Sequence, residues 1–173
     1  MAWMSAGASR LVGPTFVDDL TRADLIPELG PVATEGWIVV DEAVLLKGLY
    51  ESYSGDRSRF PDVLGYEVAV NGRGIPRFGL PDRGVGCVPP LLRWGTAFAW
   101  AALHQQHRQF PGFEVMAYVS VAELMFDPGE FSGNVTFCTK HPGGPVWTTR
   151  ASAGDDIVIS LSTADCHEPL PDR

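Results

Sequence analysis

The sequence predicts an α+β domain in which a curved antiparallel sheet wraps one long central helix. Residues 91–103 are apolar nearly all round, with Arg93 and Thr96 as their polar members. A helix of this kind must be covered on most of its sides. The chain after it contains period-2 patterns separated by Gly and Pro turns, and short turns between such runs indicate antiparallel strands.

The composition indicates one globular domain. The 173 residues correspond to about one domain, and 13 basic against 21 acidic residues give a net charge of −8. An acidic chain without a basic cluster is expected to bind nucleic acid poorly, because neutralising the phosphates needs Lys and Arg. No apolar run is long enough for a membrane span, and no export signal precedes the domain. We therefore expect a cytoplasmic protein with reduced cysteines.

The chain is expected to begin with a flexible arm over residues 1–14, followed by a single domain over 15–163 and a C-terminal tail over 164–173. Within the domain, Thr21 and Asp24 resemble a capping pair. They predict a short helical turn that Gly30-Pro31 stops.

The next segments predict a mixture of strands and one helix. Residues 36–40 are β-prone, and Asp41 is expected to cap a helix over 42–53. Residues 63–70 alternate in polarity and predict a strand that turns at Asn71-Gly72 and returns over 75–80. Pro76 restricts the returning strand to an edge.

The central helix is expected over residues 89–109, after the glycine-rich loop 84–88. About 20 residues at 1.5 Å each span roughly 30 Å, the width of a small domain. Further strands are predicted over 113–121, 131–139, 146–150 and 156–162, with turns at 127–129 and 141–144. A long buried helix followed by antiparallel strands that curl round it is the hotdog architecture.

Three stretches carry a resemblance to a known family. They are LYESYS at 49–54, the loop and helix at 84–100, and FDPGEFSGNVTFC at 126–138. They resemble parts of the actinobacterial FcoT-type long-chain fatty acyl-CoA thioesterases, which are hotdog-fold enzymes. With the length and the order of elements, the resemblance covers residues 36–162. It implies a homodimer or higher homo-oligomer that hydrolyses an acyl-CoA or acyl-carrier-protein thioester, with an acyl tunnel beside the central helix and no metal or cofactor.

The resemblance assigns some site positions and departs at others. DRGVGCVPPLLRW at 82–94 is similar to the 4-hydroxybenzoyl-CoA thioesterase pattern, in which an Asp precedes a Gly-rich loop. With a gap of about three residues, Asp82 falls on the catalytic carboxylate of that pattern. In the FcoT-type pattern two Tyr and two Asn lie near the site. Tyr53 matches one Tyr, the Asn positions fall on Cys87 and Thr96, and the second Tyr falls near Phe78-Gly79.

The loop before the central helix is the candidate site for thioester chemistry. Backbone N–H groups at a helix N-terminus stabilise the oxyanion that forms when a thioester carbonyl is attacked. Because prolines 89 and 90 carry no N–H, Gly86, Cys87 and Val88 are the expected donors, and Gly84 lets the backbone approach the substrate. The alternative is a tight turn that leads into a buried helix.

Three side chains are candidates for catalysis, each with a structural alternative. Asp82 either acts as general base or nucleophile or is an ordinary turn residue. Thr96 either orients water or the carbonyl, or donates to a carbonyl one turn earlier. Tyr53 either donates to the substrate or packs its ring on the sheet. Phe98, with Trp94 and Trp100, is expected to shape an apolar pocket.

Cysteine and histidine patterns suggest weaker alternatives. Cys87 is a nucleophile if the helix N-terminus lowers its thiol pKa, and otherwise a small buried apolar residue. His104 and His107 lie one helical turn apart, as metal ligands do, but they also suit the helix C-terminus. No metal site is expected.

The leading prediction is a thioester hydrolase. One alternative is a hotdog hydratase or dehydratase, which the absence of a histidine near residues 84–88 disfavours. The other is a protein that binds an acyl or polyketide group without catalysis, which the departures from the family pattern favour.

Overall fold

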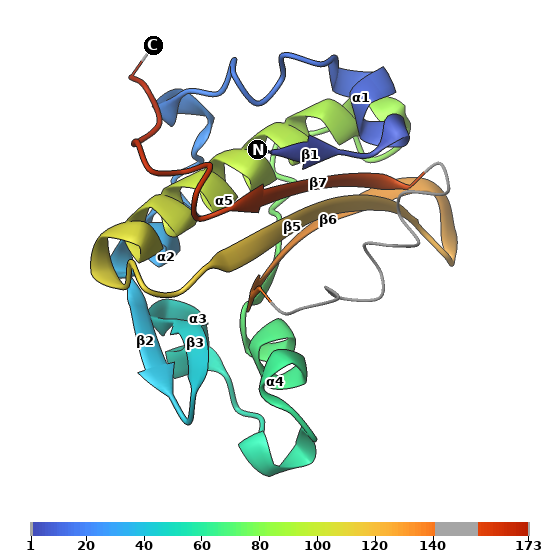
Figure 1. The fold of residues 1–173 in the computed structure, drawn as a ribbon. Coiled ribbons are helices and arrows are strands. Elements are labelled where there is room, and N and C mark those ends of the chain that lie inside the picture. The colour runs from blue at the N-terminus through green and yellow to red at the C-terminus, as the bar shows by residue number, and fades with distance from the viewer. Residues whose placement is uncertain (1, 141–155, 173) are drawn as a thin grey trace.

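A computed structural model describes residues 2–140 and 156–172. These residues form an α+β fold in which one long helix lies across an antiparallel sheet (Figure 1). The described sheet has the strand order β1-β7-β5-β6-β4, with bounds β1 Trp3–Met4, β7 Ile157–Ser162, β5 Val115–Leu124, β6 Asp127–Thr139 and β4 Gly72–Gly74. The predicted α+β class, with a long helix packed against an antiparallel sheet, is confirmed.

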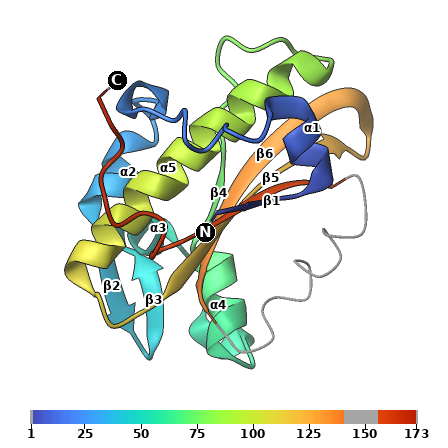
Figure 2. The ribbon, with the colours of Figure 1, turned by 45° about the horizontal axis from the view of Figure 1, so that its top comes forward.

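The long helix α5 (Val88–Gln109) is covered on both sides, as its apolar sequence requires. One side packs on β5, β6 and β7. Away from these strands, α5 also contacts α1 (Ala6–Val12), the 3-10 turn η1 (Arg22–Asp24) and α2 (Gly30–Glu35). Figure 2 shows α2 on the side of α5 that faces away from the sheet. The predicted helix over 89–109 is confirmed with one additional residue at its start.

Alternation along the strands directs one face of the sheet toward α5. Val115, Ala117, Val119 and Val121 of β5 are buried, as are Val135 and Phe137 of β6 and Ile159 and Leu161 of β7. The ring of Phe137 meets Phe98 at 5.6 Å and Trp37 at 5.5 Å, both edge-on. The main core therefore lies between α5 and this face of the sheet.

The prediction of a flexible arm over residues 1–14 is wrong for the described residues 2–14, because they are part of the fold. β1 pairs with β7 through Trp3 opposite Ser160 and Met4 opposite Ile159. Ser5 then caps α1: its Oγ accepts the N–H of Ala8 at 3.1 Å. Ladder bonds to a strand more than 150 residues away hold this segment, and no local pattern reveals such a partner.

The helix expected over 42–53 begins later than predicted. Strands β2 (Trp37–Val40) and β3 (Ala43–Leu46) form a hairpin where the first part of that helix was expected. Asp41 and Glu42 connect them with positive φ angles of 48° and 69°, the geometry of a tight hairpin turn. Helix α3 (Lys47–Ser52) follows. Asp41 therefore turns a hairpin rather than capping a helix, while the strand predicted over 36–40 is confirmed.

The strand expected over 63–70 is wrong, because these residues form helix α4 (Val63–Val70). Asp62 caps it by accepting the N–H of Gly65 at 2.7 Å. Tyr66 and Val70, one turn apart, are both buried. The period-2 pattern and the helical pattern share these two positions. The alternation in polarity therefore predicted a strand where a helix forms. The returning strand expected over 75–80 is also wrong: the nearby strand β4 lies at Gly72–Gly74 and pairs with β6.

Smaller differences concern turns. The capping pair is confirmed, since the N–H of Thr21 donates to Asp24 Oδ2 at 2.8 Å. Gly30-Pro31 starts α2 instead of stopping a helix, because proline suits the first helical turn. The predicted turn at 127–129 lies inside β6, and Met125-Phe126 forms the hairpin turn.

The remaining strand predictions divide between confirmed and untested ones. Strands over 113–121, 131–139 and 156–162 are confirmed within β5, β6 and β7. The strand over 146–150 and the turn at 141–144 lie outside the described residues. Within the described ranges, no helix combines the length and the apolar character that crossing a membrane requires.

Candidate functional site

The loop that holds Asp82 and leads into α5 is anchored on the sheet. Gly84 has a φ of +92°, a conformation that favours glycine. Its N–H donates to Gly129 O of β6 at 2.7 Å. Arg77 donates to the backbone oxygen of Asp82 at 2.7 Å and forms an ion pair with Glu130 at 3.4 Å. Hydrogen bonds to the sheet thus hold both sides of the loop.

The available backbone donors differ from those predicted. The N–H of Cys87 donates to Gly84 O at 3.4 Å, and that of Val88 donates to Val85 O. The first N–H groups of a helix have no carbonyl one turn before them. In the 3-10 turn η3 (Val85–Cys87) these groups belong to Val85 and Gly86, both exposed. Gly86 therefore remains a candidate donor, Val85 joins it, and Cys87 and Val88 are corrected to structural residues.

Asp82 is exposed and lies in the same loop as these two N–H groups. The 22 residues of α5 point their dipole toward the loop, and a helix dipole stabilises negative charge at its N-terminus. A carboxylate takes a proton from water, and backbone donors stabilise a developing oxyanion. This segment therefore contains a carboxylate and exposed backbone donors, two kinds of group that hydrolysis of a carbonyl compound can use.

Thr96 and Phe98 do not join this site. Thr96 is fully buried, and its Oγ1 donates to Leu92 O at 2.6 Å. This is the bond to a carbonyl one turn earlier, so the catalytic assignment of Thr96 is corrected. Phe98 is also fully buried, edge-on to Phe137 in the core. Phe98 therefore packs α5 against β6, and the Thr96 hydroxyl finds its partner within α5.

Tyr53 lies in another part of the molecule. It follows α3, and its ring is 6.2 Å from that of Tyr66 on α4. Both views place α3 and the β2–β3 hairpin near the C-terminal end of α5, whereas η3 precedes its N-terminal end (Figures 1 and 2). The structure therefore does not bring Tyr53 to Asp82.

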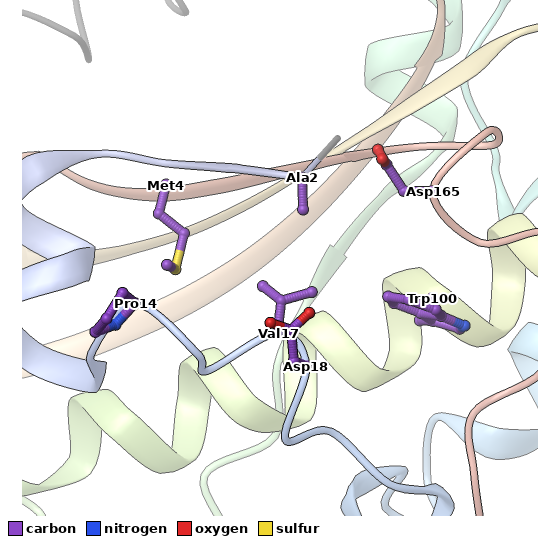
Figure 3. Close-up of a pocket in the computed structure, with 7 residues that line it drawn as sticks. All are labelled: Ala2, Met4, Pro14, Val17, Asp18, Trp100 and Asp165. Atoms are coloured by element: carbon purple, nitrogen blue, oxygen red, sulfur yellow. The ribbon is translucent and has the colours of Figure 1, made fainter.

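A cleft of about 390 Å³ lies between β1 and the outer side of α5 (Figure 3). Trp100 of α5 faces it, as expected for an apolar pocket beside the helix, whereas Phe98 does not. The other lining residues are Ala2, Met4, Pro14, Val17, Asp18 and Asp165. Sequence reasoning missed this cleft because three of its residues, Ala2, Met4 and Pro14, lie in the segment expected to be a flexible arm.

Asp165 places a stable negative charge at this cleft. Burial raises the pKa of its carboxyl, but hydrogen bonds that include those from Ser162 outweigh burial and bring the pKa below its ordinary value. The N–H and Oγ of Ser162 donate to Asp165 Oδ2 at 2.8 and 2.7 Å. The cleft is thus lined by apolar side chains together with the carboxylates of Asp18 and Asp165.

The cysteines have structural roles. Cys87, Cys138 and Cys166 are free thiols and buried. Burial and the neighbouring Glu67 raise the pKa of Cys138 to about 12, and burial also raises the pKa of Cys166. Cys87 Sγ donates to Gly84 O at 3.2 Å. None of the three is placed as a nucleophile.

His104, one of the two histidines on α5, has a backbone partner. His104 Nδ1 lies 3.1 Å from Cys166 O, which ties the C-terminal segment to the helix. Within the described part of the chain, no group of three or more His, Cys, Asp or Glu side chains is arranged to hold a metal ion.

No family model, curated protein or solved structure matches this chain.

Proposed function

We propose that this protein is a hotdog-fold hydrolase that acts on an acyl-CoA or acyl-carrier-protein thioester. The observation that carries the proposal is the place of the glycine loop. It lies at the N-terminus of a long helix packed on an antiparallel sheet, with Asp82 and the N–H groups of Val85 and Gly86 in one short segment. The resemblance to FcoT-type thioesterases supports the same reaction.

In the proposed reaction Asp82 removes a proton from water. The water oxygen forms a bond to the thioester carbonyl carbon, and the carbonyl electron pair moves onto oxygen. The N–H groups of Val85 and Gly86 donate to this oxyanion. The carbon–sulfur bond then breaks, and the thiolate leaves and takes up the proton that Asp82 holds. An acid and a free thiol result.

A second copy of the chain is part of the proposal. Large apolar side chains are exposed on the loop and on the neighbouring β5–β6 hairpin, namely Phe78 at 75%, Val85 at 63%, Met125 at 85% and Phe126 at 88%. The bond from Gly84 to Gly129 joins these two segments. Exposed apolar groups of this kind indicate an interaction surface. A homodimer covers them and adds a second wall to the open loop.

A second candidate function is the binding of an acyl group without catalysis. The apolar cleft beside Trp100 favours it, because its residues come from β1, the segment after α1 and the C-terminal segment rather than from the loop. Such a cleft accepts an alkyl chain. Neither Thr96 nor Tyr53 assembles with Asp82, and this also favours binding alone.

The test is the release of free thiol from acyl-CoAs of several chain lengths. Asp82→Asn keeps the size of the side chain and removes the base. We expect at least a tenfold loss of kcat/KM, about 1.4 kcal/mol of barrier. Asp172→Asn is the matched control, because Asp172 is exposed on the C-terminal segment. Undiminished turnover in Asp82→Asn excludes this mechanism, and saturable binding without thiol release from any substrate supports the binding function.

A further inference from the structure

A second cavity, distinct from the loop and from the cleft at Trp100, lies beside the β2–β3 hairpin. Its volume is about 530 Å³. Its walls come from the hairpin turn, from α3 and the segment after it, and from α4. The lining is dominated by three phenol rings and three carboxylates, which belong to Tyr50, Tyr53, Tyr66, Asp41, Glu51 and Asp56.

The aromatic wall is built by close packing. Tyr53 and Tyr66 meet edge-on, with ring centroids 6.2 Å apart. The ring of Tyr53 lies against Gly55 so closely that a Cβ on Gly55 would sit 2.2 Å from the Tyr53 hydroxyl. Glycine is therefore required at 55 for Tyr53 to hold this position. Tyr66 is buried beneath, at 4% exposure, and Tyr50 is half-buried.

One ring of this wall already carries a cation. Arg57 Cζ lies 5.2 Å from the centroid of the Tyr66 ring, and Arg57 Nη1 donates to Phe60 O at 2.9 Å. A cation over an aromatic face is attracted by the negative face of the ring. Burial, with Tyr50 and Tyr53 nearby, raises the pKa of Tyr66 and keeps it a neutral phenol. The geometry at Tyr66 thus shows how this wall accepts positive charge.

The charges at the mouth of the cavity are mainly negative. Asp41, Glu51 and Asp56 are exposed there, against one guanidinium from Arg57. Glu51 also forms an ion pair with Lys47 at 3.8 Å, so Asp41 and Asp56 supply most of the negative charge at the mouth. Asp56 accepts the N–H of Ser58 at 2.9 Å, and this bond lowers the pKa of its carboxyl. The chain as a whole carries −8. A rim on which negative charge predominates concentrates cations.

We propose that this cavity binds a small organic cation of the ammonium class. The phenol rings of Tyr50 and Tyr53 contact its alkyl groups and attract its charge, and the rim carboxylates of Asp41 and Asp56 neutralise it. The same carboxylates disfavour anionic ligands. The proposal does not depend on thioester chemistry, because no residue of the loop at Asp82 lines this cavity.

The experiment titrates the folded protein with choline chloride and follows binding by calorimetry and by NMR shifts of the tyrosine rings. The neutral isostere 3,3-dimethylbutan-1-ol has the same shape without the charge. We expect millimolar or tighter binding of choline and at least tenfold weaker binding of the isostere. Tyr53→Leu is expected to weaken choline binding at least fivefold. Trp3→Leu, which removes a partly exposed ring on β1 that does not line this cavity, is the matched control and is expected to leave choline binding unchanged.

A surface variant keeps the test valid if Tyr53→Leu disturbs folding. The double variant Asp41→Asn/Asp56→Asn replaces two exposed carboxylates and is expected to weaken choline binding at least fivefold with little effect on the isostere. Equal binding of choline and the isostere overturns the proposal, since the cavity then selects shape alone. Choline binding that survives both variants, or no binding at 20 mM choline, overturns it as well. None of these results affects the thiol-release test at Asp82.

Discussion

Glu67 on α4 and Thr139 on β6 are joined by two hydrogen bonds across 72 residues of sequence. Both the N–H and the Oγ1 of Thr139 donate to Glu67 Oε2 at 2.8 Å. The other oxygen of Glu67 accepts the N–H of Val44 on β3 at 2.8 Å. Glu67 is fully buried, so this carboxylate fastens the hairpin to the main sheet.

Asn71, one turn after Glu67, makes a parallel connection. Its Oδ1 accepts the N–H of Leu46 at 2.9 Å, and its Nδ2 donates to Val44 O and to Phe137 O. Backbone groups of β3 and β6 thus form hydrogen bonds with the side chain of Glu67 on α4 and with that of Asn71, which follows α4. Buried groups of this kind are costly if left without partners. The β2–β3 hairpin, α3 and α4, which line the cavity at Tyr50, Tyr53 and Tyr66, are held to the main sheet by this connection.

Replacing Glu67 by Gln is expected to lower the free energy of unfolding by about 1–3 kcal/mol. The amide keeps one acceptor oxygen, so its NH₂ group faces either the N–H of Val44 or the donors of Thr139. Urea denaturation measures the change, with the exposed Glu28→Gln as the control. Equal midpoints for Glu67→Gln and the unchanged protein would falsify this role.

Alanine at two glycines of the loop is expected to act in opposite directions. Gly84 has a φ of +92°, and a side chain there costs about 1–3 kcal/mol. At Gly86 a Cβ meets nothing within 4 Å, so Gly86→Ala is expected to raise stability by about 0.4–1 kcal/mol. Thermal unfolding of both variants measures the difference. A loss of similar size in both contradicts the conformational explanation.

Gly95→Ala is expected to destabilise the fold by about 1–3 kcal/mol through overpacking. A Cβ on Gly95 would lie 2.5 Å from Ile75 Cδ1 and 2.7 Å from Val119 Cγ1. Gly74→Ala is the control, because a Cβ there meets nothing within 4 Å. Chemical denaturation compares the two variants. Unchanged stability in Gly95→Ala shows that α5 and the sheet lie farther apart than described.

The contribution of Asp165 to stability is expected to depend on pH. Its folded pKa lies below the ordinary value of 3.8, so its stabilisation is fully present above the unfolded pKa and is lost as the pH falls through the folded pKa. Asp165→Asn is therefore expected to be less stable than the unchanged protein at pH 7, with a difference that shrinks toward pH 2.5. Denaturation at both pH values, with Asp172→Asn beside it, measures this. A difference that grows in acid contradicts the assignment.

The three cysteines are expected to react slowly with a disulfide reagent in the folded protein at pH 8. All are buried, and the pKa of Cys138 is raised to about 12. Reactivity requires the thiolate and access to solvent. Three thiols should become reactive in denaturant. One fast thiol in the folded state that Cys87→Ser removes restores Cys87 as a candidate nucleophile.

The sequence determined the features that depend on local pattern. The apolar run in α5 predicts a helix covered on both sides, and period-2 alternation predicts β5, β6 and β7. Each pattern is long enough to favour one period over the other. The glycine loop before α5 also depends on local chemistry, since Gly84 permits a positive φ and the prolines at 89 and 90 suit the first helical turn.

Tertiary structure alone decided the rest. Residues 63–70 fit both periods, and helix α4 forms because Glu67 and Asn71 then reach β3 and β6. Distances between Asp82 and Tyr53 depend on how the elements pack, so the sequence could not show that they lie apart. Thr96 was open to two interpretations until its neighbours were placed. Local pattern fixes the period of a segment, whereas hydrogen-bond partners distant in the chain decide what that segment pairs with and which side chains share a site.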